Sequence, residues 1–346
     1  MGGFPGALPD ARTPPPMDAP PLRWGVLGSG WIAERFVAAL HSSTRQRVTA
    51  IGSRDAARGG AFAALHGIPR SFSSYQELVD SDEVDVVYVA TPHPFHAPDA
   101  LLALDAGKHV LVEKPLGLSA VEATMIADRA RSHNLFCAEA MWTFFLPKFD
   151  VIRQLLDDRV LGEVLTVNAE YGEYLPPDHR IHRADLAGGP LLDLGTYPFG
   201  LATWAMGKPE QIQAAGRIGA AGVHTQAAAI LTDARGNECV IHTTMRNSTP
   251  TIATLMGAKA TLTIDGPFYQ PGDFRLDSLD RAHVLHYREP RVEHKALYFE
   301  AAEVARCISV GALETPLRPL ADSVLALTVI DEVRRQIGVV FPGEDA

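Results

Sequence analysis

The sequence predicts an α/β protein: a doubly wound parallel sheet in the first half of the chain, followed by a second domain that is rich in strands. Two observations predict the first part. Short apolar runs alternate with segments of helical periodicity between residues 23 and 142, and the run over 84–90 is apolar almost throughout. Strands of this kind are buried on both faces, which is typical of a parallel sheet covered by helices. The length of 346 residues suffices for two domains at roughly 150 residues each.

The helices of the first half have recognisable ends. Apolar residues at helical spacing, among them Ile32 and Phe36, predict a helix that starts after the glycines of "GVLGSG". Gly67 ends a second helix. Ser119, with Glu122 three residues later, forms a capping box at the start of another. The strands expected between these helices end near Leu27, Gly52, Ala90, Glu113 and Trp142.

The second half combines strand-like segments with two long amphipathic helices. Its turn "ARGNE" is typical of a hairpin. The helices over 295–311 and 320–338 are expected to pack on one face of a sheet and to leave the other face for a partner chain. The segments expected to form this sheet are 162–174, 210–219, 225–246 and 251–266.

Composition argues against several classes of partner. The net charge is −10 and the sequence has no Lys/Arg cluster, so we expect neither nucleic acid nor an anionic membrane as a partner. No apolar run is long enough to span a bilayer. Three widely spaced cysteines, Cys137, Cys239 and Cys307, argue against a disulfide framework or a thiolate zinc site, and a reducing cytoplasm fits them better.

We expect three regions along the chain. Residues 1–22 are rich in Pro, Gly and Ala and do not have the pattern of a secretory signal, so a disordered or loosely attached leader is predicted. Residues 23–141 are expected to form the parallel-sheet domain. Residues 142–346 are expected to form a domain for substrate binding and oligomerisation.

Polar residues gather where the predicted parallel strands end. Carboxyl ends of parallel strands meet at one edge of a sheet, and ligands bind there. Their shared position is therefore stronger evidence for a ligand site than any single motif. The residues in question are Gly28–Gly30, Ser53–Arg54, Thr91–His96, Glu113–Lys114 and Glu139.

The end of the first strand has the pattern of a dinucleotide turn. "GVLGSGWIA" supplies G-x-G-x-x-A at Gly28, Gly30 and Ala33. Gly28 permits a tight turn and Gly30 lets the backbone approach a pyrophosphate. The helix that begins with Trp31 and Ile32 offers free N–H groups to the anion, so both residues are candidates for cofactor binding.

The end of the second strand favours NADP over NAD. An acid at this position would bind the ribose 2′-hydroxyl of NAD, whereas this chain has Ser53 and Arg54, with Arg58 one helical turn later. A hydroxyl and guanidinium groups suit a 2′-phosphate. The alternative, that these arginines are solvated surface residues, stays open and applies more to Arg58 than to Arg54.

The end of the third strand carries two histidines. Thr91 precedes a proline that turns the backbone across the cofactor site, and His93 and His96 are candidates for contact with ribose or nicotinamide. Two histidines three residues apart also suggest a metal. The prolines around them and the lack of a nearby acid in the sequence argue against a metal site.

Lys114 is a candidate catalytic residue. It ends the fourth strand beside the expected cofactor, where an ammonium group can hydrogen-bond a substrate hydroxyl and stabilise negative charge as the proton leaves. Glu113 is a candidate to hold the lysine or the nicotinamide ribose, unless the two residues form only a structural ion pair. Trp142 is a candidate wall of the substrate pocket, whose apolar surface suits a pyranose or a cyclic diol.

These motifs together resemble the Gfo/Idh/MocA oxidoreductase family. The dinucleotide turn, "ATPHPFH", "AGKHVLVEKPL" and "EAMW" stand in this order, and the resemblance extends from about Arg23 to the C-terminus. "EAMWTFFLP" and "LAGGPLLDLGTYP" are similar to the branch of dimeric dihydrodiol dehydrogenases and NADP-dependent aldose dehydrogenases. Two departures are visible: Phe144 stands where a basic residue is expected, and His93 stands where the family often has Asn.

The resemblance implies a fold, an acid/base residue and a partner. It implies a Rossmann domain and a C-terminal α/β domain with a large, mostly antiparallel sheet, whose open face often forms an oligomer interface; a homodimer or tetramer is expected. It places the helix after Gly188-Gly189 over the nicotinamide, which makes Tyr197 the general acid/base. Asp193, four residues earlier on the same predicted helical face, is expected to orient Lys114 or bind a sugar hydroxyl. Arg180 is expected to bind substrate or to brace its loop.

We therefore predict a cytoplasmic NADP-dependent dehydrogenase or reductase that acts on a sugar, polyol or cyclic diol, with Tyr197 and Lys114 removing the hydroxyl proton. Two alternatives stay open. One is a glycoside hydrolase in which a tightly held NAD is reduced and reoxidised within each cycle; the Ser53–Arg54 pair argues against it. The other is a non-catalytic NADPH-binding sensor, which needs neither Lys114 nor Tyr197.

Overall fold

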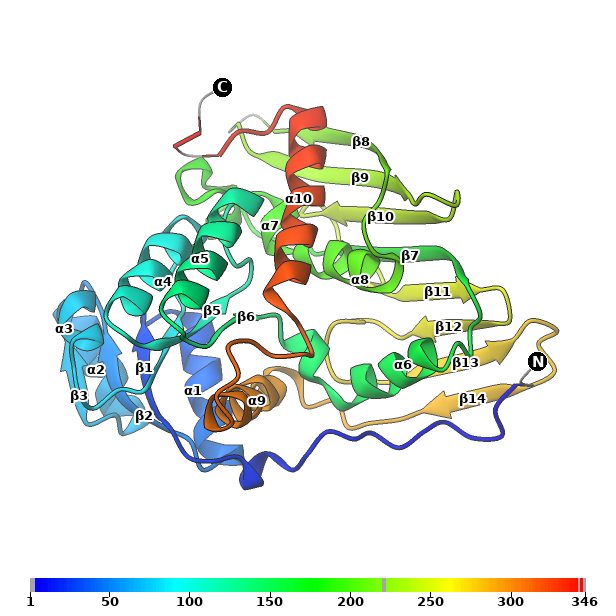
Figure 1. Ribbon diagram of the computed structural model, residues 1–346. Helices are drawn as coiled ribbons and strands as arrows, with labels where there is room; N and C mark the ends of the chain where they lie inside the picture. Colours follow the sequence, from blue (N-terminus) through cyan, green and yellow to red (C-terminus); the bar gives the residue numbers. More distant parts are fainter. Residues whose placement is uncertain (1–3, 220–221, 342, 345–346) are drawn as a thin grey trace. The chain divides into compact units, whose positions relative to one another are not determined.

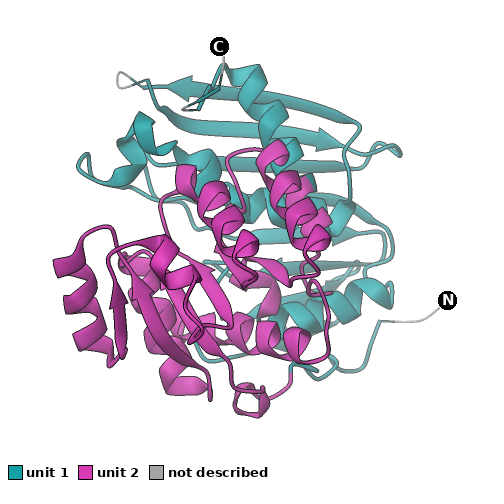
Figure 2. Ribbon diagram, turned by 60° about the vertical axis from the view of Figure 1, so that its left-hand side comes forward, with its two compact units in different colours: residues 1–13, 146–291, 325–346 teal, residues 14–145, 292–324 magenta. Residues whose placement is uncertain are grey.

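The computed structural model describes residues 4–219, 222–341 and 343–344, which form two compact units. Figure 2 shows the units in different colours. The parallel-sheet unit consists of Pro14–Phe145 and Val292–Val324, and the antiparallel-sheet unit contains the other described residues. Val292–Val324 thus clusters with the parallel sheet, whereas the sequence boundaries placed it in the second domain. The domain boundaries themselves stay predictions.

The predicted doubly wound sheet is confirmed. Its six strands are all parallel and lie in the order β3-β2-β1-β4-β5-β6, so the order in which strands are added reverses between β1 and β4 (Figure 1). β3 was not predicted, because it is a short and largely exposed edge strand without an apolar run. The strands are β1 (Arg23–Leu27), β2 (Arg47–Gly52), β3 (Arg70–Phe72), β4 (Val86–Val89), β5 (His109–Glu113) and β6 (Cys137–Ala140).

The helices predicted for this unit begin and end close to their predicted capping residues, whereas the short helix α3 was not predicted. Gly67 follows α2 with a φ of 65°, a left-handed conformation that favours glycine. The Ser119 hydroxyl accepts the Glu122 N–H, while the Glu122 carboxylate accepts the Leu118 N–H, one residue before the expected position. The helices are α1 (Trp31–Ser43), α2 (Ala56–His66), α3 (Tyr75–Val79), α4 (His96–Asp105), α5 (Ala120–Ser132) and α9 (Tyr298–Ser309).

The second sheet confirms the expected mostly antiparallel domain. Eight strands lie in the order β14-β13-β12-β11-β7-β10-β9-β8, and only the β7–β10 pair is parallel. Figure 1 shows α6 (Pro147–Asp157) and α8 (Thr196–Met206) on one side of this sheet. The strands are β7 (Val164–Gly172), β8 (Gln211–Ile218), β9 (His224–Thr232), β10 (Glu238–Thr244), β11 (Ala253–Gly257), β12 (Ala260–Ile264), β13 (Phe274–Ser278) and β14 (Val284–Tyr287). The long helix α10 is Leu320–Ile337.

One packing expectation is wrong. α9 was expected to pack on the second sheet, but it packs on α1 and on two short 3-10 helices, η1 (Pro16–Asp18) and η3 (Trp142–Phe145), in the parallel-sheet unit. The reason lies in its small side chains. Ala302 and Ala305 let α9 approach the fully buried Ala19 closely enough to form a small apolar cluster. An amphipathic pattern shows that one face of a helix is buried, but not which element buries it.

The predicted leader makes specific contacts within each unit. Arg12 forms an ion pair with Asp150 at 2.8 Å in the antiparallel-sheet unit. In the parallel-sheet unit, the Arg306 guanidinium donates to the carbonyls of Pro14 and Pro15 at 3.0 and 3.1 Å. The loose attachment of this leader stays a prediction. Substitutions that remove these contacts would test it.

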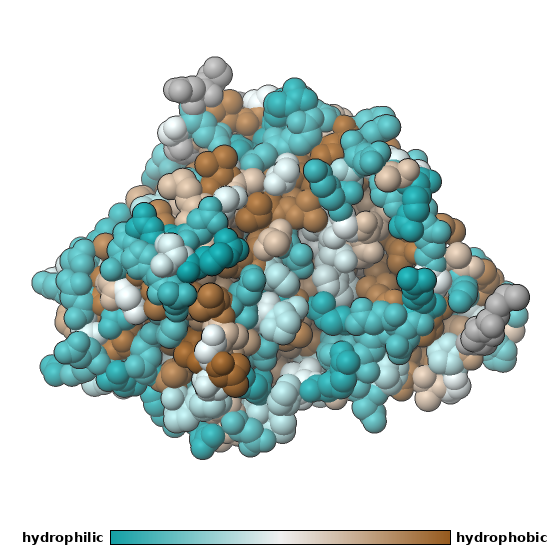
Figure 3. Space-filling view, in the orientation of Figure 1, coloured by the Kyte–Doolittle hydropathy of each residue, from teal (hydrophilic) through white to brown (hydrophobic). Residues whose placement is uncertain are grey.

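Hydrophilic and hydrophobic residues are interspersed on the molecular face in Figure 3. Within the described ranges, each helix is either too short or too polar to cross a bilayer.

Candidate active site

The loop between β1 and α1 has the geometry of an anion-binding turn. Gly28 has a φ of 99°, and a Cβ there would stand 2.7 Å from the Ala90 carbonyl oxygen, so only glycine fits. Gly30 is the N-cap of α1, no side chain caps this helix, and the space around Gly30 is open. The helix start at Trp31 and Ile32 is therefore accessible to a phosphate from the direction in which its N–H groups point.

Hydroxyl and guanidinium groups gather at the neighbouring end of β2. The Ser53 and Ser29 hydroxyls lie 3.3 Å apart, and the Arg58 guanidinium donates to the Ser29 carbonyl at 3.1 Å. The Arg54 guanidinium lies 4.8 Å from the ring centre of Phe95, a cation–π distance. Asp55 accepts the Arg58 N–H as the N-cap of α2. Ser53 and Arg58 thus lie beside the first loop, whereas Arg54 packs against Phe95 in the loop after β4.

His96 braces the two loops that follow β4 and β5. Its ring is buried, and its nitrogens lie 2.6 Å from the Pro115 carbonyl and 2.8 Å from the Thr91 carbonyl. Since both partners are acceptors, only a ring that carries both protons satisfies them together. His93 is also buried, with its ring 5.5 Å from that of His96. Contact of either histidine with a cofactor stays a prediction.

Glu113 and Lys114 end β5 as the sequence predicts. The Tyr88 hydroxyl donates to the Glu113 carboxylate, which also accepts the Lys114 backbone N–H at 3.2 Å. Through these two hydrogen bonds, Glu113 fixes the start of the loop that follows β5. The Lys114 side chain is half-buried, and the Lys114–Pro115 bond is cis.

A buried ion pair beneath this loop was not predicted as a unit. Glu139, at the end of β6, accepts the Leu116 N–H at 3.1 Å, the Arg318 guanidinium at 3.3 Å and the Ser323 hydroxyl at 2.6 Å. Both charged residues are almost completely buried. The Arg318 guanidinium also lies 4.8 Å from the ring centre of Phe144, so the residue that departs from the family pattern packs in this network.

The candidate acid/base residues of the antiparallel-sheet unit lie on two short helices. α7 (Pro190–Asp193) starts at Pro190 as predicted, but it ends at Asp193, and Tyr197 belongs to α8. The prediction of one helical face is therefore wrong. At Gly195 the backbone N–H bonds to the Pro190 carbonyl at 2.7 Å, and a Cβ would stand 2.5 Å from the Leu191 carbonyl oxygen. This close approach interrupts the regular helix.

Asp193 and Tyr197 are both largely buried and have well-defined neighbours in their own unit. The Asp193 carboxylate pairs with the Arg180 guanidinium at 2.9 Å, so Arg180 braces the loop before α7. The Tyr197 ring stacks on that of Tyr269, with ring centres 4.2 Å apart.

Two tyrosines beside Tyr197 were missed in the sequence. The Tyr171 and Tyr269 hydroxyls lie 2.7 Å apart, and the Tyr171 hydroxyl also donates to Glu173 at 2.9 Å. Burial raises the pKa of both phenols, so both stay protonated at neutral pH. The one available signal was Tyr171 in a strand that ends near the predicted active-site loop.

His224 holds the start of α7. Its Nε2 accepts the Leu191 N–H at 3.0 Å, and burial lowers its pKa to about 4, so the ring is neutral at physiological pH. Gly189 has a φ of 107°, and a Cβ there would collide with the His224 ring. The Gly-Gly-Pro sequence therefore lets the chain pass directly over this histidine.

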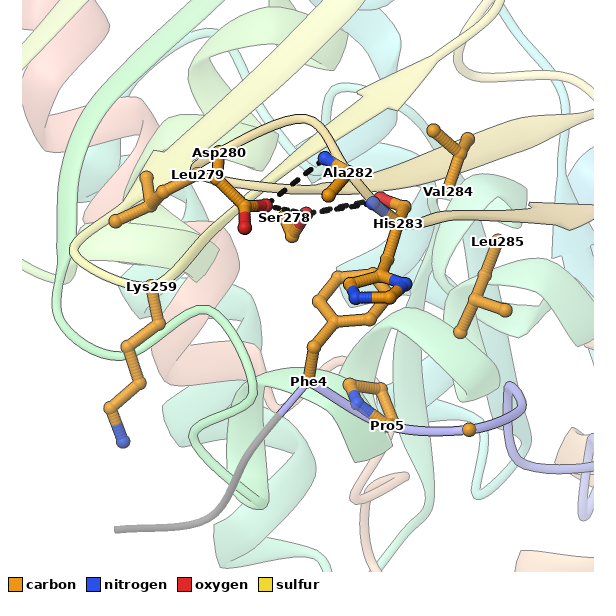
Figure 4. A pocket seen from close by; sticks show the side chains of 11 residues that line it. Phe4, Pro5, Lys259, Ser278, Leu279, Asp280, Ala282, His283, Val284 and Leu285 are labelled. Carbon is orange, nitrogen blue, oxygen red and sulfur yellow. Dashed lines mark hydrogen bonds between the residues drawn. The ribbon is translucent and has the colours of Figure 1, made fainter.

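A groove of about 850 Å³ lies elsewhere in the antiparallel-sheet unit, between the chain near Phe4 and the β13–β14 hairpin (Figure 4). Its walls include Lys259, Asp280 and His283, and the Phe4 ring stacks on His283. None of the predicted site residues lines it.

The comparison with known proteins agrees with the observed fold and with the dinucleotide-binding turn after β1. A family model described as an oxidoreductase family with an NAD-binding Rossmann fold matches residues 22–140, and a GFO/IDH/MocA C-terminal domain matches residues 149–263. The two matches, together with the turn after β1, define an oxidoreductase that binds a nicotinamide dinucleotide. The chain belongs to the Gfo/Idh/MocA family.

Among curated proteins, the chain is similar to trans-1,2-dihydrobenzene-1,2-diol dehydrogenase. The protein from Mus musculus is 35% identical over 93% of this chain and 98% of its own length. The Xenopus tropicalis protein is 32% identical over 92% and 99%.

Two solved structures share the fold. KijD10, a 3-ketoreductase from Actinomadura kijaniata in complex with NADP and TDP-benzene, has a TM-score of 0.80 at 28% identity over 92% of this chain and 98% of its own. Levoglucosan dehydrogenase in complex with NADH and levoglucosan has a TM-score of 0.82 over the same shares at 17% identity, which shows the fold alone.

Replacing Glu139 with Ala tests the buried pair. We expect a loss of about 3–5 kcal/mol in the free energy of unfolding, because the Arg318 guanidinium is left buried without its partner. Urea unfolding followed by circular dichroism measures it. As a control, Asp105→Ala removes an exposed ion pair with Arg129 and should cost less than about 1 kcal/mol. Equal stability of the two variants would contradict the assigned role.

Proposed function

We propose that the protein is a dehydrogenase or reductase that moves a hydride between NADP(H) and a secondary alcohol or carbonyl of a sugar, polyol or cyclic diol. Membership of the family supports the reaction class. The similarity to dihydrodiol dehydrogenases, at 35% identity over 98% of the length of the mouse protein, supports a carbinol substrate. The observation that carries the proposal is Lys114 at the end of β5, in a sheet whose first loop is built to bind a dinucleotide.

The residues present fit a nicotinamide dinucleotide. The loop at Gly28 and Gly30 would hold the pyrophosphate, because a side chain at Gly28 would collide with the backbone. NADP⁺, when bound, supplies the hydride acceptor for alcohol oxidation and NADPH the hydride donor for carbonyl reduction.

The chain's own residues handle the proton in this proposal. Tyr197 takes the hydroxyl proton during oxidation and returns it during reduction. Lys114, brought to the same substrate, favours the phenolate of Tyr197 by its positive charge and donates a hydrogen bond to the substrate oxygen. Asp193, held by Arg180 at 2.9 Å, orients a second hydroxyl of the substrate. Trp142 walls the pocket.

A cytoplasmic location is part of the proposal. The three cysteines are free and buried, as suits a reducing compartment. Burial raises the pKa of the Cys137 thiol to about 12, which makes it unreactive at neutral pH.

Replacing Lys114 with Met tests the reaction. We expect kcat to fall by a factor on the order of 10² or more, because both the charge and the hydrogen bond to the substrate oxygen are lost. Tyr197→Phe should reduce kcat to a similar degree, since it removes the hydroxyl that transfers the proton and keeps the aromatic ring. The assay follows NADPH absorbance across aldoses, inositols and cyclic trans-diols, with NAD(H) in parallel. NADPH binding, measured by tryptophan fluorescence, should be retained in both variants. Near-normal turnover in either one would refute its assigned role.

The preference for NADP is tested at Arg54. Arg54→Ala should weaken NADPH binding about tenfold or more, since a charge-assisted hydrogen bond contributes about 1.5–3 kcal/mol, and should leave NADH binding almost unchanged. Isothermal titration calorimetry with both cofactors measures the two affinities. Arg131→Ala, an exposed arginine on α5, is the matched control. An equal effect of the Arg54 change on both cofactors would show that it does not read the 2′-phosphate.

We also propose that the open face of the second sheet binds another copy of this chain. Neighbouring strands place Val240 opposite Ile230, and these side chains are 43% and 42% exposed. Ile252 extends the same face and is 39% exposed. The face is mixed in character, because the exposed Asn168 lies beside Val240 on the neighbouring strand β7, and interfaces between protein chains commonly combine polar and apolar side chains in this way.

Val240→Asp should dissociate the assembly, because a carboxylate would be buried without a partner in the interface. Light scattering coupled to size exclusion measures the mass: a dimer or tetramer is expected for the natural chain and a monomer for the variant. Val310→Asp, at a more exposed valine after α9, should keep the natural mass. A monomeric natural chain would refute the proposal.

A further inference from the structure

The segment after the second sheet returns to the parallel-sheet unit and places a histidine between two indoles. Its 3-10 helix η6 (Glu293–Leu297) packs on α1. The His294 ring lies 5.3 Å from that of Trp142, nearly parallel at 13°, and 4.8 Å from that of Trp31, edge-on at 81°. We call these three rings the aromatic bridge.

The aromatic bridge joins two distant positions on the ligand-binding edge of the sheet. Trp31 is the first residue of α1, directly after the turn that follows β1. Trp142 follows β6, the last strand of the sheet. In a doubly wound sheet, β1–β3 form the half that holds the adenine nucleotide, and β4–β6 form the half that holds the nicotinamide nucleotide. The bridge therefore flanks the nicotinamide half.

Two properties of the bridge indicate a ligand. Trp31 is 56% exposed even with the Arg35 guanidinium 5.6 Å from its ring centre, so its large indole still offers an apolar surface that a ligand can cover. Burial and the nearby cations Arg35 and Lys114 lower the pKa of His294, so the ring is neutral at physiological pH. A neutral imidazole can stack on a ring and still donate or accept one hydrogen bond, as a ribose hydroxyl requires.

We propose that His294 is a cofactor-binding residue, and that the aromatic bridge walls the nicotinamide nucleotide of NADP(H) and slows its release. This inference rests on the proposed function, because it assigns the bridge to the same cofactor. Each aromatic contact contributes a factor of roughly two to ten to an equilibrium constant. Loss of His294 breaks the contacts with both indoles.

The test compares the whole cofactor with its adenine half. NADPH and 2′,5′-ADP are titrated into the natural chain and into His294→Ala, His294→Phe and Trp31→Ala, with tryptophan emission for NADPH and calorimetry for both ligands. Stopped-flow fluorescence gives the NADPH dissociation rate. His283→Ala is the matched control, since His283 also stacks on an aromatic ring, Phe4, in the other unit. Thermal melting without ligand verifies that each variant is folded.

We expect His294→Ala to weaken NADPH binding about five- to tenfold, mainly through faster dissociation, and to leave 2′,5′-ADP binding unchanged. His294→Phe, which keeps a stacking ring, should recover most of the affinity. Trp31→Ala, at an exposed position that folding tolerates, should reproduce the loss, and His283→Ala should bind like the natural chain.

Three results would overturn the inference in different ways. Unchanged NADPH binding in both His294→Ala and Trp31→Ala would show that the bridge does not contact the cofactor. An equal loss for NADPH and 2′,5′-ADP would show that the bridge only supports the fold. A folded natural chain that binds neither NADPH nor NADH would refute the proposed function itself, which the first two results leave intact.

Discussion

The candidate site depends on the hydrogen bonds and the ion pair that the buried Glu139 carboxylate makes. A buried carboxylate must be paired, and its partners come from three separate parts of the chain: the loop after β5, the segment that carries Arg318, and Ser323. On the other side of the same loop, His96 binds the Pro115 carbonyl. Between these two braces the backbone has little freedom. Lys114 thus projects from a loop held by polar contacts beneath it and beside it.

The antiparallel-sheet unit positions its candidate residues by different means. Neutral groups predominate there: His224 is uncharged, and the phenols of Tyr171 and Tyr269 keep their protons. The ion pair of Arg180 and Asp193 adds one positive and one negative charge, which cancel each other. The surroundings of Tyr197 are therefore rich in hydroxyl groups and aromatic faces, which suit the ring with several hydroxyls that the proposed function requires. The cations that suit phosphate are in the other unit, at Arg54 and Arg58.

Local sequence patterns were sufficient for most of the parallel sheet, and the reasons are specific. β4 and β5 have apolar runs with a proline shortly beyond them, so their existence and their carboxyl ends could be predicted. β3 has no such run, because an edge strand of three residues needs none. The interruption between α7 and α8 could not be predicted, since it arises from the approach of Gly195 to the Leu191 carbonyl. His294 was missed for a related reason: its two partners are far away in the sequence, and no local pattern marks such a contact.

The parallel-sheet unit is built from two stretches of chain separated by the whole second sheet. During synthesis the first stretch, through Phe145, leaves the ribosome long before Arg318 exists. Until then Glu139 has no cation, Ala19 has no helix against it, and Trp142 has no imidazole beside it. The nascent sheet can collapse around its own apolar strands, but its ligand-binding edge is completed only when the chain is nearly finished.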